Sequence, residues 1–277
     1  MSQRFAARLV PARPDLAAES LRGSVTAERY APGEVRRVTR PLLDLTATAD
    51  PAAECATQLV FGEAFTVYED RQDGLAWGQA ELDGYVGFVR ADGLRASPGP
   101  RQRLTAPWSH VYDRPHPRAR SLAGLPCLAE VAVGGTTGGF ARLRGSGFVP
   151  RAHLDPVVDW VALAERFAGA PYLWGGRSLG GIDCSGLVQV ALLAAGRAAP
   201  RDSDMQAAFL GTDLAAGSPL LRGDLVFWKG HVGIIQDRDS LLHANAHHMA
   251  VVSEPLAAAV ERIGGAGGGA VLQLRRL

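Results

Sequence analysis

Between residues 40 and 154, short apolar segments alternate with polar turns. Segments such as "AFTVYE" and "LAEVAV" carry apolar side chains at roughly every second position, and each is followed by a turn sequence, "DRQDG" or "GGTTGG". Alternation with a period of two is typical of strands that bury one face, and clusters of Gly, Asp and Thr are typical of the turns between them. The pattern therefore predicts short antiparallel strands.

This β region follows one plan twice. Residues 40 to 94 and 108 to 154 each begin with a short apolar strand, and they close on similar sequences, "DGYVGFVRADGL" and "RGSGFVPRAHL". An internal repeat of this length indicates two copies of one structural unit. We predict small β-barrels at residues 40 to 98 and 104 to 155, preceded by an N-terminal extension at residues 1 to 39. The alternative is a single irregular β domain.

The pattern changes after Leu154. Asp155 and Pro156 are typical of an N-cap and a first helical turn, and apolar residues then recur at helical spacing. A second helical run, "CSGLVQVALLAAG", follows Asp183 and ends at Gly196. Its expected buried stripe consists of Leu187, Val190, Ala191 and Ala194.

Consecutive strand-like segments complete the chain: "GDLVFW", "HVGIIQ", "LLHAN", "AVVSE" and "AVLQLRRL". A group of helices followed by a run of strands is typical of an α+β domain with an antiparallel sheet. We therefore predict such a domain at residues 156 to 277, and the glycine-rich stretch at 264 to 270 is expected to be a turn or a flexible connection before the last strand.

Composition narrows the possible partners. The 277 residues are 47% hydrophobic, which suffices for buried cores, and 29 Lys and Arg against 28 Asp and Glu leave a net charge of +1. This balance gives no global field for nucleic acid or an anionic membrane. The start of the sequence lacks the apolar core of an export signal, and three cysteines form no paired spacing. We expect a soluble protein of the reducing cytoplasm.

Cys184 stands at the start of the second helical run, with Asp183 as the expected N-cap. The positive end of a helix dipole and a neighbouring imidazolium both favour a thiolate, so we expect the pKa of this thiol to be lowered. The alternative is that Cys184 is only a small buried hydrophobic residue. We assign that role to Cys55 and Cys127 in the β repeats.

Two histidines favour the catalytic interpretation. His231 opens the strand "HVGIIQ" and His243 lies in the next strand, "LLHAN", so that their rings can lie side by side on neighbouring antiparallel strands. His231 can then share a proton with Cys184, and His243 can fix the tautomer of His231. The alternative is a metal site of His243, His247 and His248, but their spacing requires a helix where the pattern predicts a strand and a turn.

The blocks "APYLWGG", "GIDCSGLVQ", "PRDSDMQ", "LRGDLVFWKGHVGIIQD" and "LLHAN" resemble, in order, the catalytic domain of the NlpC-type cell-wall cysteine peptidases. The double β repeat is similar to the paired bacterial SH3-like domains of one subgroup. The resemblance implies a papain-like fold for residues 156 to 277. It also implies nucleophile Cys184, base His231, third residue His243, and a Tyr172 hydroxyl at the oxyanion site.

Further residues match positions that line the substrate pocket in that family, namely Asp183, Ser185, Ser203 and Trp174. A carboxylate pointing at the thiol would raise its pKa, so we expect Asp183 to point into the pocket and to receive a cationic substrate amine. Glu63 and Tyr85, in the first β repeat, are candidates to surround the same ammonium group.

The activity implied by the resemblance is hydrolysis of the γ-D-glutamyl bond to an L-diamino acid, meso-diaminopimelate or lysine, in murein peptides with a free N-terminal L-alanine. Such an enzyme recycles peptidoglycan fragments and needs no metal and no cofactor. Its partner is the murein peptide, with no nucleic acid and no membrane, and the oligomeric state stays open. One alternative is an amidase or acyltransferase on the same scaffold, and another is a protein that only binds murein fragments.

Overall fold

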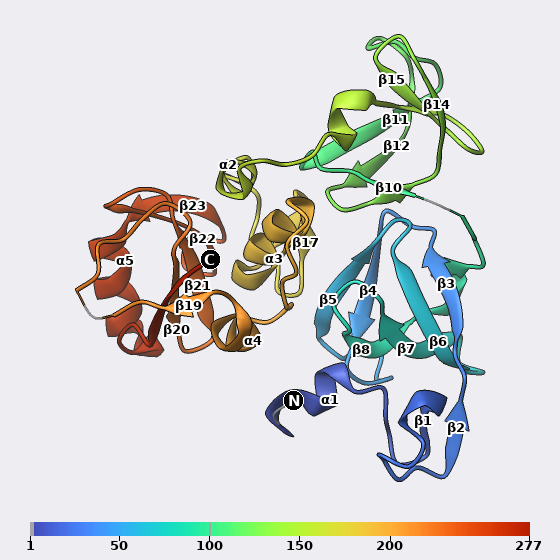
Figure 1. Ribbon diagram of the computed structural model, residues 1–277, viewed down its shortest axis with the longest axis horizontal. Coiled ribbons are helices and arrows are strands. Elements are labelled where there is room, and N and C mark those ends of the chain that lie inside the picture. The colour runs from blue at the N-terminus through green and yellow to red at the C-terminus, as the bar shows by residue number, and fades with distance from the viewer. Residues whose placement is uncertain (1–2, 100, 216) are drawn as a thin grey trace. The chain divides into compact units, whose positions relative to one another are not determined.

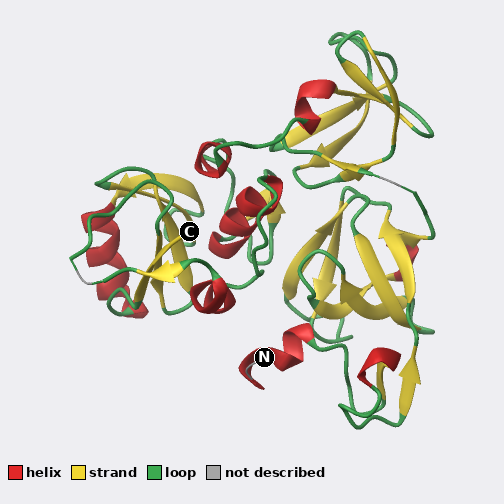
Figure 2. Cartoon of the chain, viewed as in Figure 1, coloured by secondary structure: helices red, strands yellow, loops and turns green. Residues whose placement is uncertain are grey.

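The computed structural model describes residues 3–99, 101–215 and 217–277, and the chain divides into two compact units. Unit 1 consists of residues 1–104 and 108–155, and unit 2 of residues 105–107 and 156–277. Strands dominate unit 1, whereas unit 2 combines helices with strands (Figures 1 and 2). The predicted α+β class is confirmed.

A sheet of seven strands forms the first half of unit 1, in the order β5-β4-β8-β7-β6-β3-β9, with every pairing antiparallel. The strands are β3 (Glu34–Val38), β4 (Leu42–Thr46), β5 (Cys55–Val60), β6 (Ala64–Asp70), β7 (Leu75–Ala80), β8 (Val86–Arg90) and β9 (Leu94–Arg95). The sheet therefore begins at residue 34, earlier than the predicted boundary at residue 40, because β3 pairs with both β6 and β9.

The N-terminal extension packs on this sheet. Leu16 lies in one buried cluster with Trp77, Val86 and Phe88, and the Arg13 guanidinium lies 4.4 Å from the centroid of the Trp77 ring. A cation over an indole face is attracted by the ring quadrupole. The elements of the extension are α1 (Gln3–Leu9), β1 (Leu16–Ala18), the 3₁₀ turn η1 (Glu19–Leu21) and β2 (Arg29–Ala31), with β1 and β2 parallel.

The second half of unit 1 has a separate core that includes Leu104, Val111, Leu125 and Val149. Its strands are β10 (Gln102–Arg103), β11 (Trp108–Tyr112), β12 (Ser121–Pro126), β13 (Glu130–Val131), β14 (Val133–Thr137), β15 (Phe140–Leu143) and β16 (Phe148–Pro150). They form a sheet in the order β12-β11-β16-β15-β14 and a β10–β13 pair.

The two halves of unit 1 close in the same way, as the repeated sequence suggests. Strand β8 runs into the 3₁₀ turn η2 (Ala91–Gly93), and β16 runs into η3 (Arg151–Leu154). The halves are joined by an ion pair between Arg37 and Glu130 at 2.8 Å. The two separate cores therefore share one arrangement at their ends.

Unit 2 opens with α2 (Trp160–Glu165), whose N-cap is Asp159. The Asp159 carboxylate accepts hydrogen bonds from the amides of Val161 and Ala162, at 2.9 and 3.0 Å. The prediction that Asp155 caps this helix is wrong, because Asp155 instead closes the preceding 3₁₀ turn and pairs with Arg151. Both aspartates have the side chain that an N-cap needs, and the tertiary structure selects the second.

Six antiparallel strands build the sheet of unit 2 in the order β19-β24-β20-β21-β22-β23. Their bounds are β19 (Thr212–Asp213), β20 (Leu225–Trp228), β21 (His231–Ile235), β22 (Ser240–Asn245), β23 (Ala250–Pro255) and β24 (Gln273–Arg276). Two further short strands, β17 (Arg177–Ser178) and β18 (Gly181–Ile182), pair with each other before the central helix.

The remaining helices are α3 (Cys184–Ala194), α4 (Ser203–Phe209) and α5 (Leu256–Ile263). Helix α5 continues into a π-helical turn, η4 (Gly264–Gly268), where a turn or a flexible connection was expected; Gly267, at a φ of 86°, breaks the helical geometry there. Helices α3 and α5 lie on opposite sides of the sheet (Figure 1), and both contact β22.

All residues of α3 are buried, and not only the predicted stripe. The helix contacts α2, α4, β17 and the strands β21 and β22, so it is covered on several sides. It ends before Gly196, whose φ of 73° lies in the left-handed region that suits a glycine after a helix. The fold thus holds the N-terminus of α3, and with it Cys184, in a fixed place against the sheet.

Candidate active site

Cys184 is the first residue of α3, as the sequence predicts. Asp183 is the N-cap, and its Oδ1 accepts a hydrogen bond from the amide of Gly186 at 2.7 Å. The thiol is buried, at 7% exposure, and the backbone amides of Val232 and Ser185 face it as hydrogen-bond donors. Since Val232 follows His231 directly, the start of β21 lies beside the sulfur.

The two predicted histidines lie next to each other. Nε2 of His231 and Nδ1 of His243 are 2.7 Å apart, and the ring centroids are 5.0 Å apart. Strands β21 and β22 are antiparallel neighbours, with Ile235 opposite Leu241, so side chains at alternate positions share one face of the sheet. The register places both imidazoles on that face, and His243 can orient His231 through its remote nitrogen.

The expected low pKa of the Cys184 thiol is wrong. Burial raises the pKa of Cys184 to about 12, and the negative charge of Asp183 raises it further. The amides of Val232 and Ser185 and the charge of Arg201 act in the opposite direction but do not outweigh burial. A thiolate in this site loses most of its hydration, and a helix terminus alone replaces too little of it.

His231 also prefers its neutral form. Burial lowers the pKa of His231 to about 3, and the neighbouring His243 contributes to the same shift. The pKa of His243 is lowered as well, mainly by burial. In the substrate-free site the thiol and the imidazole therefore both prefer their neutral forms, and a proton must leave the thiol when the sulfur attacks.

This resting state leads to a test by alkylation. We expect the rate at which iodoacetamide alkylates Cys184 to keep rising above about pH 9, because a raised pKa shifts thiolate formation to higher pH. Mass spectrometry of the peptide that contains Cys184 separates its modification from that of Cys55 and Cys127. A rate that levels off below about pH 7 would instead indicate a preformed thiolate and imidazolium pair.

Tyr172 lies close enough to the nucleophile to interact with it electrostatically. Burial raises the pKa of Tyr172 to about 12, with further contributions from Cys184 and Asp183. Its backbone amide donates to the carbonyl of Met249 at 2.9 Å, which fixes the residue against the start of β23. The phenol is therefore a neutral hydroxyl at working pH and can donate a hydrogen bond to a developing oxyanion.

Asp183 has structural contacts that the sequence did not predict. Its carboxylate forms a bidentate pair with Arg201, through Oδ1 at 2.9 Å and Oδ2 at 2.6 Å, and Oδ2 also accepts from the amide of Gly175. Together with the cap at Gly186 and a contact from Ser185, five donors surround two oxygens. A carboxylate has about four acceptor positions, so these contacts hold Asp183 in place in the substrate-free site, and its expected contact with a substrate ammonium stays a prediction.

Arg201 was missed in the sequence analysis, although it belongs to the block "PRDSDMQ". Its guanidinium also donates to the hydroxyl of Ser185 at 3.0 Å, so Ser185 is held between Asp183 and Arg201. Gln206 of the same block donates to the carbonyls of Ser185 and Pro200, both at 2.9 Å. These contacts fix the first turn of α3, which carries the nucleophile.

The other predicted pocket residues differ in exposure. The Trp174 indole is 59% exposed, and it lies in the loop that follows Tyr172. Ser203 is the first residue of α4 and is half-buried. An exposed aromatic side chain is available to contact an incoming peptide, so the predicted role of Trp174 stays a prediction that its exposure allows.

The alternative metal site gains no support from the contacts of its histidines. His243 already faces His231 through Nδ1 and Glu254 through Nε2, the latter at 2.6 Å. Within the described ranges, no three His, Cys, Asp or Glu side chains are grouped as a metal site would require.

Among residues 3–99, 101–215 and 217–277, no helix is long and apolar enough to cross a membrane.

The two candidates from the first β repeat are both buried, Glu63 at 1% and Tyr85 at 6% exposure. One carboxylate oxygen of Glu63 accepts a hydrogen bond from the amide of Val60 at 3.0 Å, so the side chain stabilises the turn after β5. This contact differs from the expected ammonium contact and gives Glu63 a structural role. The role of Tyr85 in binding substrate stays a prediction.

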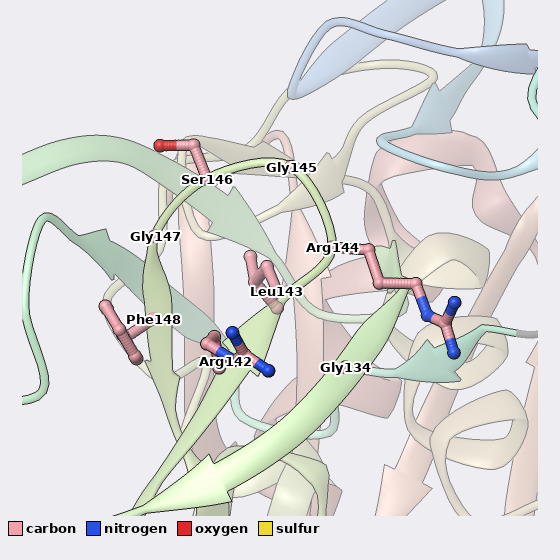
Figure 3. A pocket seen from close by; sticks show the side chains of 8 residues that line it. All are labelled: Gly134, Arg142, Leu143, Arg144, Gly145, Ser146, Gly147 and Phe148. Atoms are coloured by element: carbon pink, nitrogen blue, oxygen red, sulfur yellow. The ribbon is translucent and has the colours of Figure 1, made fainter.

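A cavity of about 500 Å³ opens in the second half of unit 1, between β14, β15 and β16 (Figure 3). Leu143 and Phe148 supply apolar walls, Arg142 and Arg144 supply charge, and the loop 145–147 forms its rim. None of the predicted site residues lines it. The catalytic assignment therefore depends on the side chains around Cys184 and not on the size of a cavity.

Comparison with known proteins identifies the families that two parts of the chain resemble. Residues 169–260 match the NlpC/P60 family, and residues 45–94 match the family described as the bacterial dipeptidyl-peptidase Sh3 domain. Among solved structures, an NlpC/P60 family protein from Bacillus cereus superimposes with a TM-score of 0.72 at 18% identity, over 88% of this chain and 99% of that one. At that identity the likeness shows the fold alone. The predicted papain-like fold and the first of the two predicted SH3-like domains are confirmed, and the second SH3-like domain stays a prediction.

Two curated relatives carry related names. The gamma-D-glutamyl-L-lysine dipeptidyl-peptidase of Bacillus subtilis is 28% identical over 216 residues, which cover 68% of this chain and 71% of the relative. The dipeptidyl-peptidase 6 of Lysinibacillus sphaericus is 35% identical over 85 residues, which cover 31% of this chain and 31% of the relative. The match to the second relative thus spans less than a third of its length.

Proposed function

Since the chain carries an NlpC/P60 domain behind a bacterial dipeptidyl-peptidase SH3 domain, we propose that it is a cysteine endopeptidase of murein peptides. The bond cleaved is the amide between the γ-carboxyl of D-glutamate and an L-diamino acid, in a peptide with a free N-terminal L-alanine. The observation that carries the proposal is the array of Cys184, His231 and His243. Nε2 of His231 and Nδ1 of His243 are 2.7 Å apart, and the thiol lies beside the amide that follows His231.

The geometry suits an acyl transfer in two steps. The sulfur of Cys184 attacks the γ-carbonyl carbon of D-glutamate while its proton passes to His231, and the carbonyl oxygen becomes an oxyanion. The phenol of Tyr172 and the amide at the start of α3 are the donors that stabilise that charge. His231 then gives its proton to the leaving amine of the diamino acid, and the C–N bond breaks to leave a thioester.

Water completes the cycle. His231 takes a proton from the attacking water, and a second tetrahedral intermediate forms on the thioester carbon. The C–S bond then breaks while His231 gives that proton to the sulfur, which releases the dipeptide and the Cys184 thiol. An amine in place of water would give the acyltransferase alternative. Because a neutral His231 can accept a proton at each step, the resting state of the site suits both halves of the reaction.

The names of both relatives contain the term dipeptidyl-peptidase, an activity that releases two residues from a free N-terminus. We extend the requirement for a free N-terminal amine to this chain. An odd set of three cysteines, one of them the nucleophile, suits a reducing compartment, so we place the activity in the cytoplasm, where released murein peptides are recycled.

Product analysis tests this function directly. We expect mass spectrometry to detect L-Ala-D-Glu and the free diamino acid from L-Ala-γ-D-Glu-L-Lys or its meso-diaminopimelate form. Acetylation of the N-terminus should lower kcat/KM by about thirtyfold or more, because a charge-assisted contact of roughly 2 kcal/mol or more is lost. The Cys184→Ala variant is the control for adventitious hydrolysis.

The outcomes separate the alternatives. Equal cleavage of free and acetylated peptides would overturn the requirement for a free terminus and, with it, the recycling role. Binding without cleavage would identify a protein that only holds murein fragments. Transfer of the L-Ala-D-Glu acyl group to an added amine, in preference to water, would identify an acyltransferase.

A further inference from the structure

Two side chains compete for one ring nitrogen of His243. Oε1 of Glu254 lies 2.6 Å from Nε2, and Nδ2 of Asn245 lies 3.0 Å from the same atom. A carboxylate can only accept a proton from that nitrogen, whereas an amide nitrogen can only donate one to it. The two neighbours therefore require opposite tautomers of a neutral His243.

The strand register brings these groups together. Glu254 of β23 stands opposite Leu241, two positions from His243 on β22, so it occupies the same face at a diagonal position. Asn245 follows His243 by two residues and shares that face. Arg262, in the last turn of α5, hydrogen-bonds to Oε1 of Glu254.

The orientation of Asn245 is fixed by a backbone group. The amide of His248 donates to Oδ1 of Asn245 at 2.8 Å, so the oxygen of the side-chain amide faces the turn and its nitrogen faces His243. Rotation of the amide by 180° would place two donors against each other. Asn245 thus favours the tautomer of His243 that has no proton on Nε2.

The tautomer of His243 determines the tautomer of His231, the proposed base. With a proton on Nε2, Nδ1 of His243 accepts a hydrogen bond from Nε2 of His231, and Nδ1 of neutral His231 keeps its lone pair. With the opposite tautomer, His243 donates to Nε2 of His231, and the proton of His231 moves to Nδ1. Only the first arrangement leaves His231 a nitrogen that can take the proton of Cys184.

We propose that Glu254 is a positioning residue that, held by Arg262, selects the tautomer of His243 and thereby makes His231 a base. The inference rests on the proposed function of Cys184 and His231. It adds two residues to the array of Cys184, His231 and His243. Glu254 contacts His243, and Arg262 contacts Glu254.

Charge decides the competition in favour of Glu254. Burial acts to raise the pKa of Glu254, but hydrogen bonds from His243 and Arg262 outweigh it, and the pKa is lowered. Glu254 is therefore an anion, and a charge-assisted hydrogen bond is shorter and about twice as strong as a neutral one. The distances agree, at 2.6 Å to the carboxylate against 3.0 Å to the amide.

Ring nitrogen NMR tests the proposal without any substrate. In the full chain with ¹⁵N-labelled histidine, we expect His231 and His243 both to show a proton on Nε2, with assignments from the His231→Gln and His243→Gln spectra. Glu254→Ala should move the proton of both rings to Nδ1 and lower kcat by about a hundredfold or more with little change in KM, because the base is lost. Glu254→Gln can still accept from Nε2 but lacks the charge, so we expect a mixture of tautomers and a kcat between those of Glu254→Ala and the parent chain.

Controls separate positioning from folding. Glu165→Ala removes a carboxylate that also pairs with an arginine in unit 2 but lies outside this network, and it should change neither the tautomers nor kcat. A Glu254→Ala variant that loses activity while both rings keep the proton on Nε2 would overturn the proposal and leave Glu254 a structural residue. A Glu254→Gln variant with a lower kcat than Glu254→Ala would overturn it as well. The NMR measurement needs no substrate, so it tests the role of Glu254 even if murein peptides are not cleaved. A failure of the proposed function can therefore be distinguished from a failure of this proposal.

Discussion

Replacing Cys184 or His231 by alanine should lower kcat/KM for L-Ala-γ-D-Glu-L-Lys by about a thousandfold or more in each case, because members of a catalytic array act as a unit. The double variant should lose little more than either single one. Steady-state release of the diamino acid, followed by mass spectrometry, measures all three. An effect of the double variant equal to the product of the single effects would mean that the two residues act independently.

The loss should occur without unfolding. Cys184 is a small residue whose sulfur points at polar amides, so its truncation leaves little apolar volume unfilled. Circular dichroism and the thermal midpoint of Cys184→Ala should stay close to those of the parent chain. Cys55→Ala provides the matched thiol control, since Cys55 lies in β5 of unit 1, and it should retain full activity. An inactive Cys55→Ala variant together with an active Cys184→Ala variant would show that Cys184 is not the nucleophile.

The nucleophile and the histidines could be predicted because their surroundings are local in sequence. An aspartate followed by an apolar helical run specifies where α3 starts, and strand alternation places His231 and His243 on neighbouring strands. The register that joins them follows from the short connection between β21 and β22. Site residues can therefore be predicted where they lie in helices and strands that are adjacent in sequence and have a clear hydrophobic pattern.

Arg201 and Glu254 could not be predicted in the same way, because their roles depend on tertiary placement. Arg201 lies 18 positions after Asp183, and only the packing of the segment before α4 on the start of α3 brings the charges together. Glu254 sits in a strand whose alternation shows a polar position and nothing about its partner. A carboxylate at a diagonal position from a catalytic histidine becomes visible only when the register of β22 and β23 is known.

The pKa of Cys184 shows a similar limit. The sequence reveals the helix terminus, which favours the thiolate, but it does not reveal that the thiol is buried beside Asp183. Burial is a property of the whole unit, and here it outweighs the local dipole. The sequence likewise does not reveal that Glu63 is buried and that its carboxylate accepts a hydrogen bond from the amide of Val60.

The buried pair of Asp183 and Arg201 should control the stability of unit 2. We expect Arg201→Ala to lower the free energy of unfolding by about 3 to 5 kcal/mol, because it leaves the Asp183 carboxylate buried without its cation. The side chains are 8% and 1% exposed, and their closest atoms are 2.6 Å apart. Arg201→Met, which keeps much of the side-chain volume, should be nearly as damaging, since the uncompensated charge remains.

Arg222 offers the matched control in the same unit. It pairs with Glu165 at 2.6 Å, the same distance as the closest atoms of the buried pair, but its side chain is 38% exposed and that of Glu165 is 32% exposed. An exposed pair is screened by water, so Arg222→Ala should cost less than about 1 kcal/mol. Chemical denaturation followed by fluorescence measures both variants, and hydrogen exchange of the amides of α3 assigns the loss to unit 2.

The double variant Asp183→Asn with Arg201→Met distinguishes the mechanism from simple loss of packing. If the cost of Arg201→Met comes from an unpaired buried carboxylate, removing that charge should recover most of the stability, because replacing both members of a buried pair is often nearly neutral. Asparagine can still cap α3, so the contact with the amide of Gly186 is kept. Additive losses in the double variant would show that the two side chains stabilise unit 2 independently. Recovered stability with impaired turnover would show that the pair also positions the first turn of α3, where Ser185 and the nucleophile lie.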